Sequence, residues 1–450
     1  MIFDFIKYVQ PTWTFTLVPG KAPQFSSIYY HPDLAPMKGV DLMDIDNNYE
    51  TNAAKWADLG FRAWHMGEVA MISGENVGKI EALGKPTIHD EYRFITKFWG
   101  KKWALYTLFI RVCSLKNPFR EVSNYLRTKA TPKYKLYDKQ LDRSDFNNIE
   151  YPFLTANPKV SVIIPTLNRY VYLVDVLRDL ELQDYKNFDV IVVDQSEPVD
   201  KEFYKQFNID IKLIEQREKL LWTARNRAVK VSDAEYLLFF DDDSRVKPDW
   251  ITNHLKCLHY FDADVSAGVS LSPNGKVQDS YKIFRWADQF DSGNALVKRS
   301  VFRKLGLFDE QFNKLRMGDG EFGYRMYLAG IKSISNPLAD RLHLKAGEGG
   351  LRQMGSWDGF RPKKITAPRP VPSVLYLFRK YFKVKNVILN LFLSVPQSII
   401  PYKYKHDKKK RIVGYLMLVL LFPLVLFQVM HSWLIASRML KEGSKIEHLS

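Results

Sequence analysis

Short apolar runs alternate with helical stretches through the middle of the chain. Four runs rich in Val, Ile, Leu and Phe predict buried β-strands: 159–165 (KVSVIIP), 188–194 (FDVIVVD), 209–215 (IDIKLIE) and 235–241 (EYLLFFD). A helical pattern is predicted between the first two, from about Tyr170 to Leu182. Strands that alternate with helices at this spacing indicate parallel βαβ units. We therefore expect an α/β domain with a mostly parallel central sheet.

Polar residues follow three of these runs, at the points where the predicted strands end. They are Thr166 to Arg169, Asp194, and the adjacent aspartates Asp241 to Asp243. Open α/β sheets bind ligands at the carboxyl ends of their strands, so we expect these residues to meet in one crevice. Three neighbouring carboxylates repel one another unless positive groups or a cation neutralise them. The alternative is a strand that ends in a solvated acidic turn.

The C-terminal part has a different pattern. Residues 412–437 contain no Asp, Glu, Lys or Arg, and this stretch exceeds the roughly 20 apolar residues that cross a bilayer. Pro423 near its centre is compatible with a kinked or re-entrant segment. The basic run 403–411 (KYKHDKKKR) is expected on the cytoplasmic side. The alternative is a helix buried in the core of the protein.

Residues 374–394 (VLYLFRKYFKVKNVILNLFLS) have an amphipathic helical pattern with a basic stripe. The polar stripe is formed by Arg379, Lys383, Asn386 and Asn390, and the apolar side by Leu377, Tyr381, Val384, Ile388 and Leu391. A helix of this kind can lie in the surface of a membrane, or it can pack on the α/β domain as an ordinary surface helix. Together with the apolar stretch, it predicts that residues 361–450 anchor the chain to a membrane.

The charge supports a lipid partner. The chain of 450 residues has a formal net charge of +16, and residues 361–411 contribute fourteen Lys and Arg against one acidic residue. Nucleic-acid-binding proteins usually spread basic residues over a folded face, whereas here they flank apolar sequence. We therefore expect an anionic membrane and no nucleic acid as partner.

The two cysteines exclude a disulfide framework and a cysteine zinc site, which fits a reducing, cytosol-facing environment. The first residues (MIFDFIKYVQPTW) have no basic start followed by an apolar run, so they do not resemble a secretory signal. Residues 1–150 are interpreted as an N-terminal accessory domain of unknown role. The chain is long enough for two or three such parts.

Four motifs, in the expected order, resemble the inverting family 2 glycosyltransferases of bacterial surface-polysaccharide synthesis. They are VSVIIPTLNR (160–169), VIVVDQS (190–196), FFDDDS (239–244) and MGDGEFGYRMYLAG (317–330). The resemblance covers roughly residues 158–352. It implies the nucleotide-sugar-binding fold called GT-A, which we place at 156–352.

The resemblance also implies roles for individual residues. Asp319 matches the catalytic base, and Asp243, Asp241 and His343 match the ligands of Mn²⁺ or Mg²⁺ in a DXD-type motif. Oxygen and imidazole ligands suit these cations. The expected contacts with a UDP or dTDP sugar donor are Pro165, Thr166, Asn168, Arg169, Asp194, Arg225, Asn226, Asp241 and Asp242. Gly293, Asn294 and Glu321 are expected to contact the acceptor. The alternatives are a structural histidine at His343 and a helix cap at Asp319.

Two positions depart from the pattern of this family. Gly318 stands where a Glu commonly precedes the base, and EKLLWTARN (218–226) replaces a loop that often contains Asn-x-Gly. The leading hypothesis remains a metal-dependent inverting transferase that acts on a lipid-linked saccharide at the cytoplasmic face of the inner membrane. The alternatives are a sugar nucleotidyltransferase and a scaffold that binds nucleotide sugars without activity.

Overall fold

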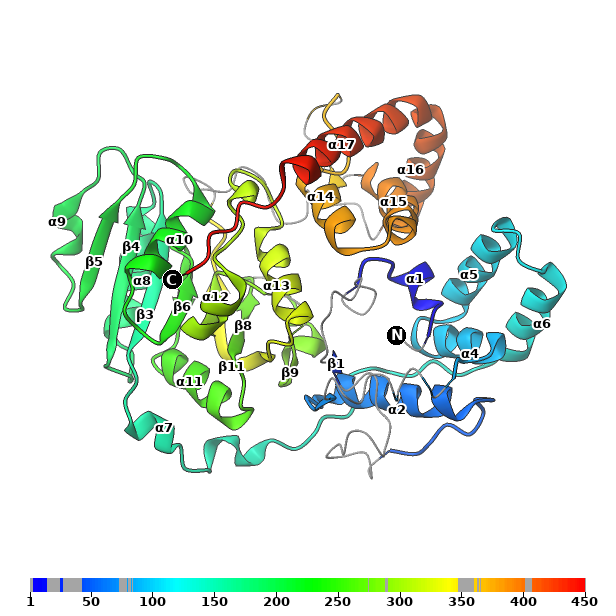
Figure 1. Ribbon diagram of the computed structural model, residues 1–450, viewed down its shortest axis with the longest axis horizontal. Coiled ribbons are helices and arrows are strands. Elements are labelled where there is room, and N and C mark those ends of the chain that lie inside the picture. The colour runs from blue at the N-terminus through cyan, green and yellow to red at the C-terminus, as the bar shows by residue number, and fades with distance from the viewer. Residues whose placement is uncertain are drawn as a thin grey trace.

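The computed structural model describes residues 3–13, 25–26, 43–72, 79, 82, 84–273, 275–287, 290–346, 360–361, 364, 366–400 and 407–449. The central sheet lies on one side of the molecule, the N-terminal helices lie on the other, and the C-terminal helices lie at the top right (Figure 1). The chain thus has a mixed α/β domain with additional helical regions at both ends.

The first half of the sheet follows the predicted pattern. β3 (Val160–Thr166), β4 (Phe188–Asp194), β5 (Ile211–Glu215) and β6 (Tyr236–Phe240) pair in parallel in the order β5-β4-β3-β6. Every residue of β3 and β6 is buried, as expected for strands with helices on both faces. The four strands and their parallel pairing confirm the sequence prediction.

The second half of the sheet differs from the prediction. β10 (Asn294–Lys298) runs antiparallel to both β6 and β8 (Val265–Leu271), and β8 runs parallel to β11 (Ser333–His343). β11 also pairs antiparallel with β7 (Ser244–Val246) and β9 (Arg285–Trp286). The expectation of a mostly parallel sheet was wrong, because half of the strand pairings are antiparallel. The mixed sheet brings His343 at the end of β11 opposite Ser244, next to the three aspartates.

Helices cover both faces of the sheet. α8 (Tyr170–Glu181) and α11 (Trp250–Tyr260) pack on one face. α10 (Leu221–Val231), α12 (Arg299–Leu305) and α13 (Gly318–Leu328) pack on the other. The sheet is therefore enclosed, and its polar residues are confined to the strand ends.

The N-terminal region has its own aromatic core. Its elements are α1 (Ile6–Val9), β1 (Phe25–Ser26), α2 (Asn52–Met66), β2 (Met71–Ile72), α4 (Ile88–Phe98), α5 (Lys101–Cys113) and α6 (Pro118–Thr128). Phe61, Trp64 and Phe94 are fully buried at its centre. The short helices η4 (Ser144–Asn147) and α7 (Pro152–Thr155) lie on the connection to β3.

The C-terminal region contains α14 (Pro372–Tyr381), α15 (Val384–Ser398), α16 (Lys408–Leu420) and α17 (Phe422–Glu442). The amphipathic stretch predicted at 374–394 is divided into two helices between Tyr381 and Val384. The apolar side of α14, including Leu375 and Leu377, is buried in the same core as the sheet. The prediction that this segment lies in a membrane surface was therefore wrong for α14, because the α/β domain buries that side.

The apolar stretch 412–437 is not a straight helix. In the described part of the chain, no single helix combines the length and hydropathy of a membrane span. The pair Ile412–Leu420 and Phe422–Glu442 meets those requirements together, with a bend of 81° between the two helices. Pro423 stands in the first turn of α17, where a proline fits without loss of a helical hydrogen bond. The break therefore lies where the sequence predicted a kink.

Candidate active site

The three aspartates begin directly after β6, and the first of them is shared between two arginines. Asp241 Oδ1 accepts a hydrogen bond from Arg225 at 2.9 Å, and its Oδ2 accepts one from Arg341 at 2.8 Å. The side chains of these arginines are 0% and 1% exposed. Two buried guanidinium groups therefore neutralise the carboxylate that begins the acidic run.

Asp242 points toward the first strand. The Thr166 hydroxyl donates to Asp242 Oδ2 at 2.8 Å, and Arg169 Nη1 donates to Oδ1 at 2.9 Å. Burial raises the pKa of Asp242 to about 6, although the charge and hydrogen bond of Arg169 oppose that shift. The structure thus joins Thr166, Arg169 and Asp242, as expected from their positions at the strand ends.

Asp243 lies between β3 and the end of β11. Its Oδ1 is 3.3 Å from Nε2 of His343, and its Oδ2 accepts the backbone N–H of Ala346 at 3.0 Å. Burial acts to raise the pKa of Asp243, but the hydrogen bond with His343 and the positive charge of Arg169 outweigh it and lower the pKa below its usual value. The carboxylate is therefore held in its charged form, which is the form that binds a cation.

Asp241, Asp243 and His343 can hold one metal ion. One ligand atom from each of them lies within 4.8 Å of the others. Neighbouring ligands of an octahedral cation with bonds of about 2.1 Å are roughly 3 Å apart, close to the separation of the Asp243 and His343 atoms. Two carboxylates and one imidazole fit Mn²⁺ or Mg²⁺ by the chemistry of their donor atoms.

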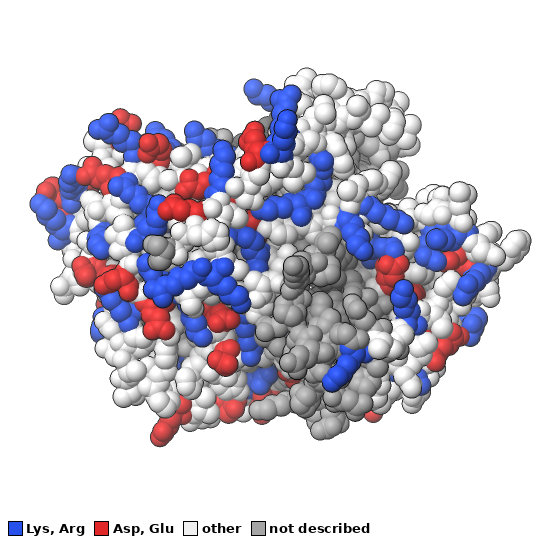
Figure 2. All heavy atoms as spheres, in the orientation of Figure 1, with Lys and Arg blue, Asp and Glu red and all other residues white. Residues whose placement is uncertain are grey.

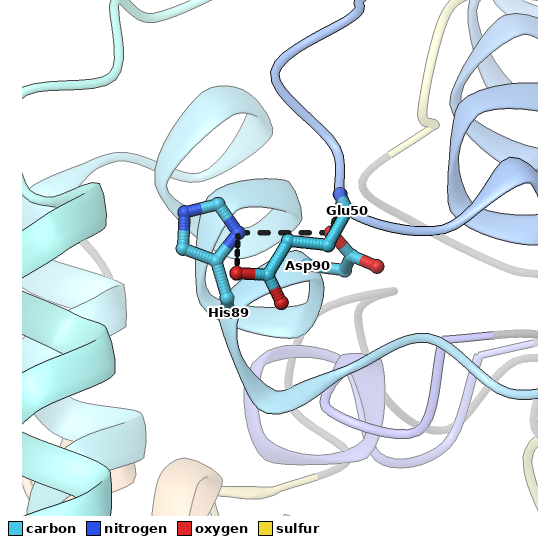
Figure 3. A group of neighbouring side chains, drawn as sticks. All are labelled: Glu50, His89 and Asp90. Atoms are coloured by element: carbon cyan, nitrogen blue, oxygen red, sulfur yellow. Dashed lines mark hydrogen bonds and ion pairs between the residues drawn. The ribbon is translucent and has the colours of Figure 1, made fainter.

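A second group of similar composition lies in the N-terminal region, where His89 Nδ1 is 3.8 Å from Glu50 and 3.7 Å from Asp90 (Figure 3). Here, both oxygens of Asp90 accept hydrogen bonds from the chain, including the backbone N–H groups of Glu50 at 2.6 Å and Thr51 at 3.2 Å. Asp90 also completes a capping box with Thr87 at the start of α4. These contacts account for the group as a brace between two segments. The group at His343 instead lies at strand ends of the central sheet, where α/β folds bind their ligands, so it is the better candidate.

Asp319 lies in the first turn of α13. The backbone N–H of Ser292 donates to Asp319 Oδ1 at 3.1 Å, and the Ser292 hydroxyl donates to the same oxygen. Asp291, next to Ser292, accepts a hydrogen bond from Arg341 at 3.0 Å. Arg341 therefore connects Asp241 with the loop that contacts Asp319.

Gly293 in this loop lies against the same group. A Cβ atom at this position would be 2.2 Å from Asp241 Oδ2 and 2.5 Å from both terminal nitrogens of Arg341. Only glycine allows such close approach. Sequence reasoning missed Arg341, Asp291 and Ser292. The available signals were an arginine two residues before His343 and the polar pair before Gly293.

Three predicted contact residues are buried and hydrogen-bonded within the protein. Asn226 is 1% exposed and exchanges hydrogen bonds with the backbone of Phe308. Asn294 is 0% exposed, receives the Trp250 indole N–H at 2.9 Å, and donates to backbone carbonyls of β8 and β11. The Glu321 carboxylate is 0% exposed and is bonded to Arg325, Lys380 and Tyr381. These geometries are structural, so the acceptor role expected for Asn294 and Glu321 does not fit.

The predicted donor contacts at the ends of β3 and β4 differ in their exposure to solvent. Pro165 is buried within β3, whereas Asn168 is exposed beyond it with a left-handed φ of 52°. Asp194 is 0% exposed, and its Oδ2 accepts hydrogen bonds from the hydroxyls of Tyr170 at 2.6 Å and Tyr204 at 2.7 Å. A contact between Asp194 and a nucleobase would require these tyrosines to rearrange.

The two departures from the family pattern meet in space. A Cβ atom on Gly318 would lie 2.2 Å from Cζ2 of Trp222, which belongs to the changed segment 218–226. The indole therefore occupies the volume that a larger residue at 318 would need. The changed loop and the glycine before Asp319 form one packing arrangement.

Comparisons with known proteins match the middle part of the chain to one family. The family model described as "Glycosyl transferase family 2" matches residues 161–328. Glycosyltransferase GlyA of Streptococcus pneumoniae is 27% identical over 40% of this chain and 30% of that protein. Chondroitin synthase of Escherichia coli is 25% identical over 51% of this chain and 40% of that protein. The matches thus span less than half of these relatives.

Solved structures give a weaker likeness. TarS residues 1–349 of Staphylococcus aureus, in complex with UDP-GlcNAc, match with a TM-score of 0.42 and 17% identity, over 62% of this chain and 81% of that chain. The mannosyltransferase PcManGT of Pyrobaculum calidifontis, in complex with GDP-Man and Mn²⁺, matches with a TM-score of 0.41 and 17% identity, over 62% of this chain and 86% of that chain.

Proposed function

Because residues 161–328 match the family 2 glycosyltransferases, we propose that the chain is a metal-dependent, inverting enzyme of this family with a GT-A domain. It transfers a sugar from a nucleotide-sugar donor, with UDP or dTDP as the nucleotide, to a lipid-linked saccharide during glycan synthesis. Relatives such as chondroitin synthase and the amylovoran biosynthesis glycosyltransferase AmsB of Erwinia amylovora support a role in polysaccharide assembly.

One observation carries this proposal: Asp241, Asp243 and His343 form a cation-sized group, and Arg341 links it to the loop beside Asp319. Bound there, Mn²⁺ or Mg²⁺ would neutralise the negative charge of a nucleoside diphosphate leaving group. Arg169, whose side chain is 14% exposed, follows the neighbouring strand β3 and is placed to contact a phosphate.

Asp319 is assigned the role of general base. The hydrogen bonds from Ser292 fix the orientation of its carboxylate, so that it can accept a proton from an acceptor hydroxyl. An inverting transfer needs one such base and no covalent intermediate.

The C-terminal helices support a membrane-presented acceptor. α16 and α17 expose large apolar side chains that a bilayer would cover. The exposed residues are Ile412, Val413, Leu416, Met417, Val419, Leu420, Phe422, Leu426, Phe427, Met430 and Leu434. The basic residues before α16 suit an anionic cytoplasmic leaflet, so we place the enzyme at the cytoplasmic face of the cell membrane.

Thermal unfolding tests the donor and the metal together. UDP, dTDP, GDP and CMP are added with and without Mn²⁺ to the wild type, to Asp243→Ala, and to the control Asp249→Ala, which changes an exposed acid six residues away. At one hundred times its Kd, a ligand stabilises by about 2.7 kcal/mol. We expect an Mn²⁺-dependent shift with UDP or dTDP that is lost only in Asp243→Ala. Equal shifts in all three proteins, or none with any nucleotide, would contradict the proposal.

The stereochemistry is tested separately. With an α-linked donor, the proton NMR spectrum of the first product formed is expected to contain a β-linked sugar. An α-linked product would exclude inversion. It would not contradict the proposed metal site.

A further inference from the structure

The hairpin of α5 and α6, joined by residues 114–117, exposes many large apolar side chains. Seven large apolar side chains on its outer side are exposed, and two of them lie at its tip. They are Leu105 (53%), Phe109 (62%), Val112 (36%), Leu115 (94%), Phe119 (85%), Val122 (40%) and Leu126 (48%). Their spacing of three and four residues places them along one side of each helix.

The inner side of the hairpin is held by a buried ion pair. Arg111 on α5 donates to both carboxylate oxygens of Glu121 on α6, at 2.8 and 2.5 Å. The Tyr92 hydroxyl donates to Glu121 at 2.8 Å, and the Arg111 guanidinium lies 4.1 Å from the ring centre of Phe5. The inner side of the hairpin thus holds one buried charged pair, while its large exposed apolar side chains are suited to an apolar environment beyond the protein.

The charge around the apolar face identifies the kind of partner. Residues 101–139 contain ten Lys and Arg but only two acidic residues, Glu121 and Asp138. Figure 2 shows white surface at the hairpin end, with blue Lys and Arg side chains and some red acidic side chains beside it. Trp103 and Tyr106 are half-buried on the same helix, as is common for aromatic residues at a membrane interface. Apolar residues ringed by cations fit an anionic lipid surface.

The position of the hairpin supports the same partner. α5 and α6 lie at the end of the molecule opposite β5 and α9 (Lys201–Tyr204), and α15, α16 and α17 lie toward that end as well (Figure 1). α1 contacts both α5 and α15, and Asn390 of α15 donates to Thr12 at 2.7 Å, so the two regions are joined. We propose that the α5–α6 hairpin inserts its apolar tip into the interface of an anionic bilayer, as a membrane contact separate from α16 and α17.

A probe at Cys113 tests this insertion in the full chain. Cys113 is exposed at the end of α5 and Cys257 is buried, so an environment-sensitive fluorophore can be attached to Cys113. On vesicles of phosphatidylcholine and phosphatidylglycerol, its emission is expected to shift to shorter wavelength, with quenching by spin-labelled lipids. The control carries the same fluorophore at Leu182→Cys in a Cys113→Ser background. Residue 182 is also exposed but lies on the catalytic domain, so no shift is expected.

Vesicle affinity gives a second readout. Leu115→Ser with Phe119→Ser is expected to bind these vesicles at least tenfold more weakly, whereas Leu182→Ser with Val231→Ser, at two exposed positions of the catalytic domain, binds like the wild type. Nucleotide-induced stabilisation is expected to be equal in all three proteins, which separates this inference from the proposed function.

Three results would overturn the inference. The first is a Cys113 probe that remains in water while the protein is bound to vesicles, since α16 and α17 would then account for binding alone. The second is a lack of binding to these vesicles. The third is a probe shift without vesicles that accompanies a doubling of the mass in light scattering, because a second copy of the chain would then cover this face.

Discussion

At the scale of single residues, the acidic run is balanced by arginines from distant parts of the chain. Arg169 contacts Asp242 and Asp243, and Arg225 and Arg341 contact Asp241. Desolvation of a guanidinium costs several kcal/mol, so a buried arginine is retained only where it is paired. The three arginines therefore fix the carboxylates in position before any ligand is present.

Arg341→Met tests the importance of this pairing for the fold. The variant removes the buried cation that Asp241 and Asp291 share. We expect the free energy of unfolding, measured in urea, to fall by about 3–5 kcal/mol. The control is Lys247→Met, which removes a pair with Asp340 whose lysine is 68% exposed and costs less than about 1 kcal/mol. Equal losses in both variants would show that burial of the pair is unimportant.

Gly293→Ala tests the close contact beside Asp319. The added methyl group would overlap Asp241 and Arg341, so the loop that contains Ser292 must shift away from Asp319. We expect kcat to fall at least tenfold, which corresponds to a shift of about 1.4 kcal/mol in the barrier. Gly320→Ala is the matched control, because its methyl group would make only ordinary contacts of 3.5 Å or more. Similar rates for both variants would contradict this assignment.

The sequence predicted the positions of the acidic run, His343 and Asp319 better than it predicted the contacts around them. Motif order was sufficient to bring these residues together. It did not distinguish a ligand contact from a structural hydrogen bond at Asn226 or Asn294, because that depends on which backbone groups pack against them. The partnership of Arg341 with Asp241 spans one hundred residues and leaves no local pattern.

At the scale of elements, α13 is held by the C-terminal helix α14. Lys380 and Tyr381 of α14 bind the Glu321 carboxylate at 2.9 and 2.6 Å, and Arg325 of α13 binds its other oxygen at 2.9 Å. Since Asp319 lies two residues before Glu321, α14 fixes the helix that positions the proposed base. The C-terminal region is thus part of the catalytic domain through α14.

Glu321→Gln tests this link. The substitution retains the shape of the side chain but removes the charge that Lys380 and Arg325 contact, so the free energy of unfolding is expected to fall by about 1.5–3 kcal/mol. Glu202→Gln is the control, because the Glu202 side chain is 77% exposed and its pair with Lys205 contributes little. A loss in Glu202→Gln as large as that in Glu321→Gln would contradict the account.

His254 links α11 to two strands and gives the fold a dependence on pH. Its ring nitrogens are 2.9 Å from the Ser266 hydroxyl and 3.1 Å from Asn294 Oδ1, and burial lowers its pKa to about 4. The pKa of His254 is lower in the folded state than in the unfolded state. The stability that neutral His254 contributes is therefore fully present above about pH 6.5 and is lost as the pH falls toward 4. The loss amounts to roughly 3 kcal/mol.

The variant His254→Gln is expected to reduce this dependence. Unfolding free energies measured between pH 7 and pH 4.5 should fall less steeply than in the wild type, even though the variant is less stable at pH 7. A slope identical to that of the wild type would exclude His254 as a source of the dependence.

At the scale of the whole molecule, the catalytic domain is joined to helical regions on two sides. The final residues return to the catalytic domain, where the Glu447 carbonyl accepts the N–H of Leu307 at 2.7 Å. α14 and this last segment therefore fix both ends of the α15–α17 region. The sequence predicted the apolar stretch 412–437 and a kink near Pro423, whereas the burial of α14 results from packing against the rest of the chain.

The central claim is that Asp241, Asp243 and His343 hold one divalent cation. Electron paramagnetic resonance of free Mn²⁺, measured during titration with protein in the presence of UDP, tests it most directly. His343→Ala is compared with His89→Ala, which alters the other three-residue group. We expect one Mn²⁺ per chain in the wild type and in His89→Ala, and at least tenfold weaker binding in His343→Ala. Unchanged affinity in His343→Ala, together with a loss in His89→Ala, would contradict the claim and place the cation in the N-terminal region.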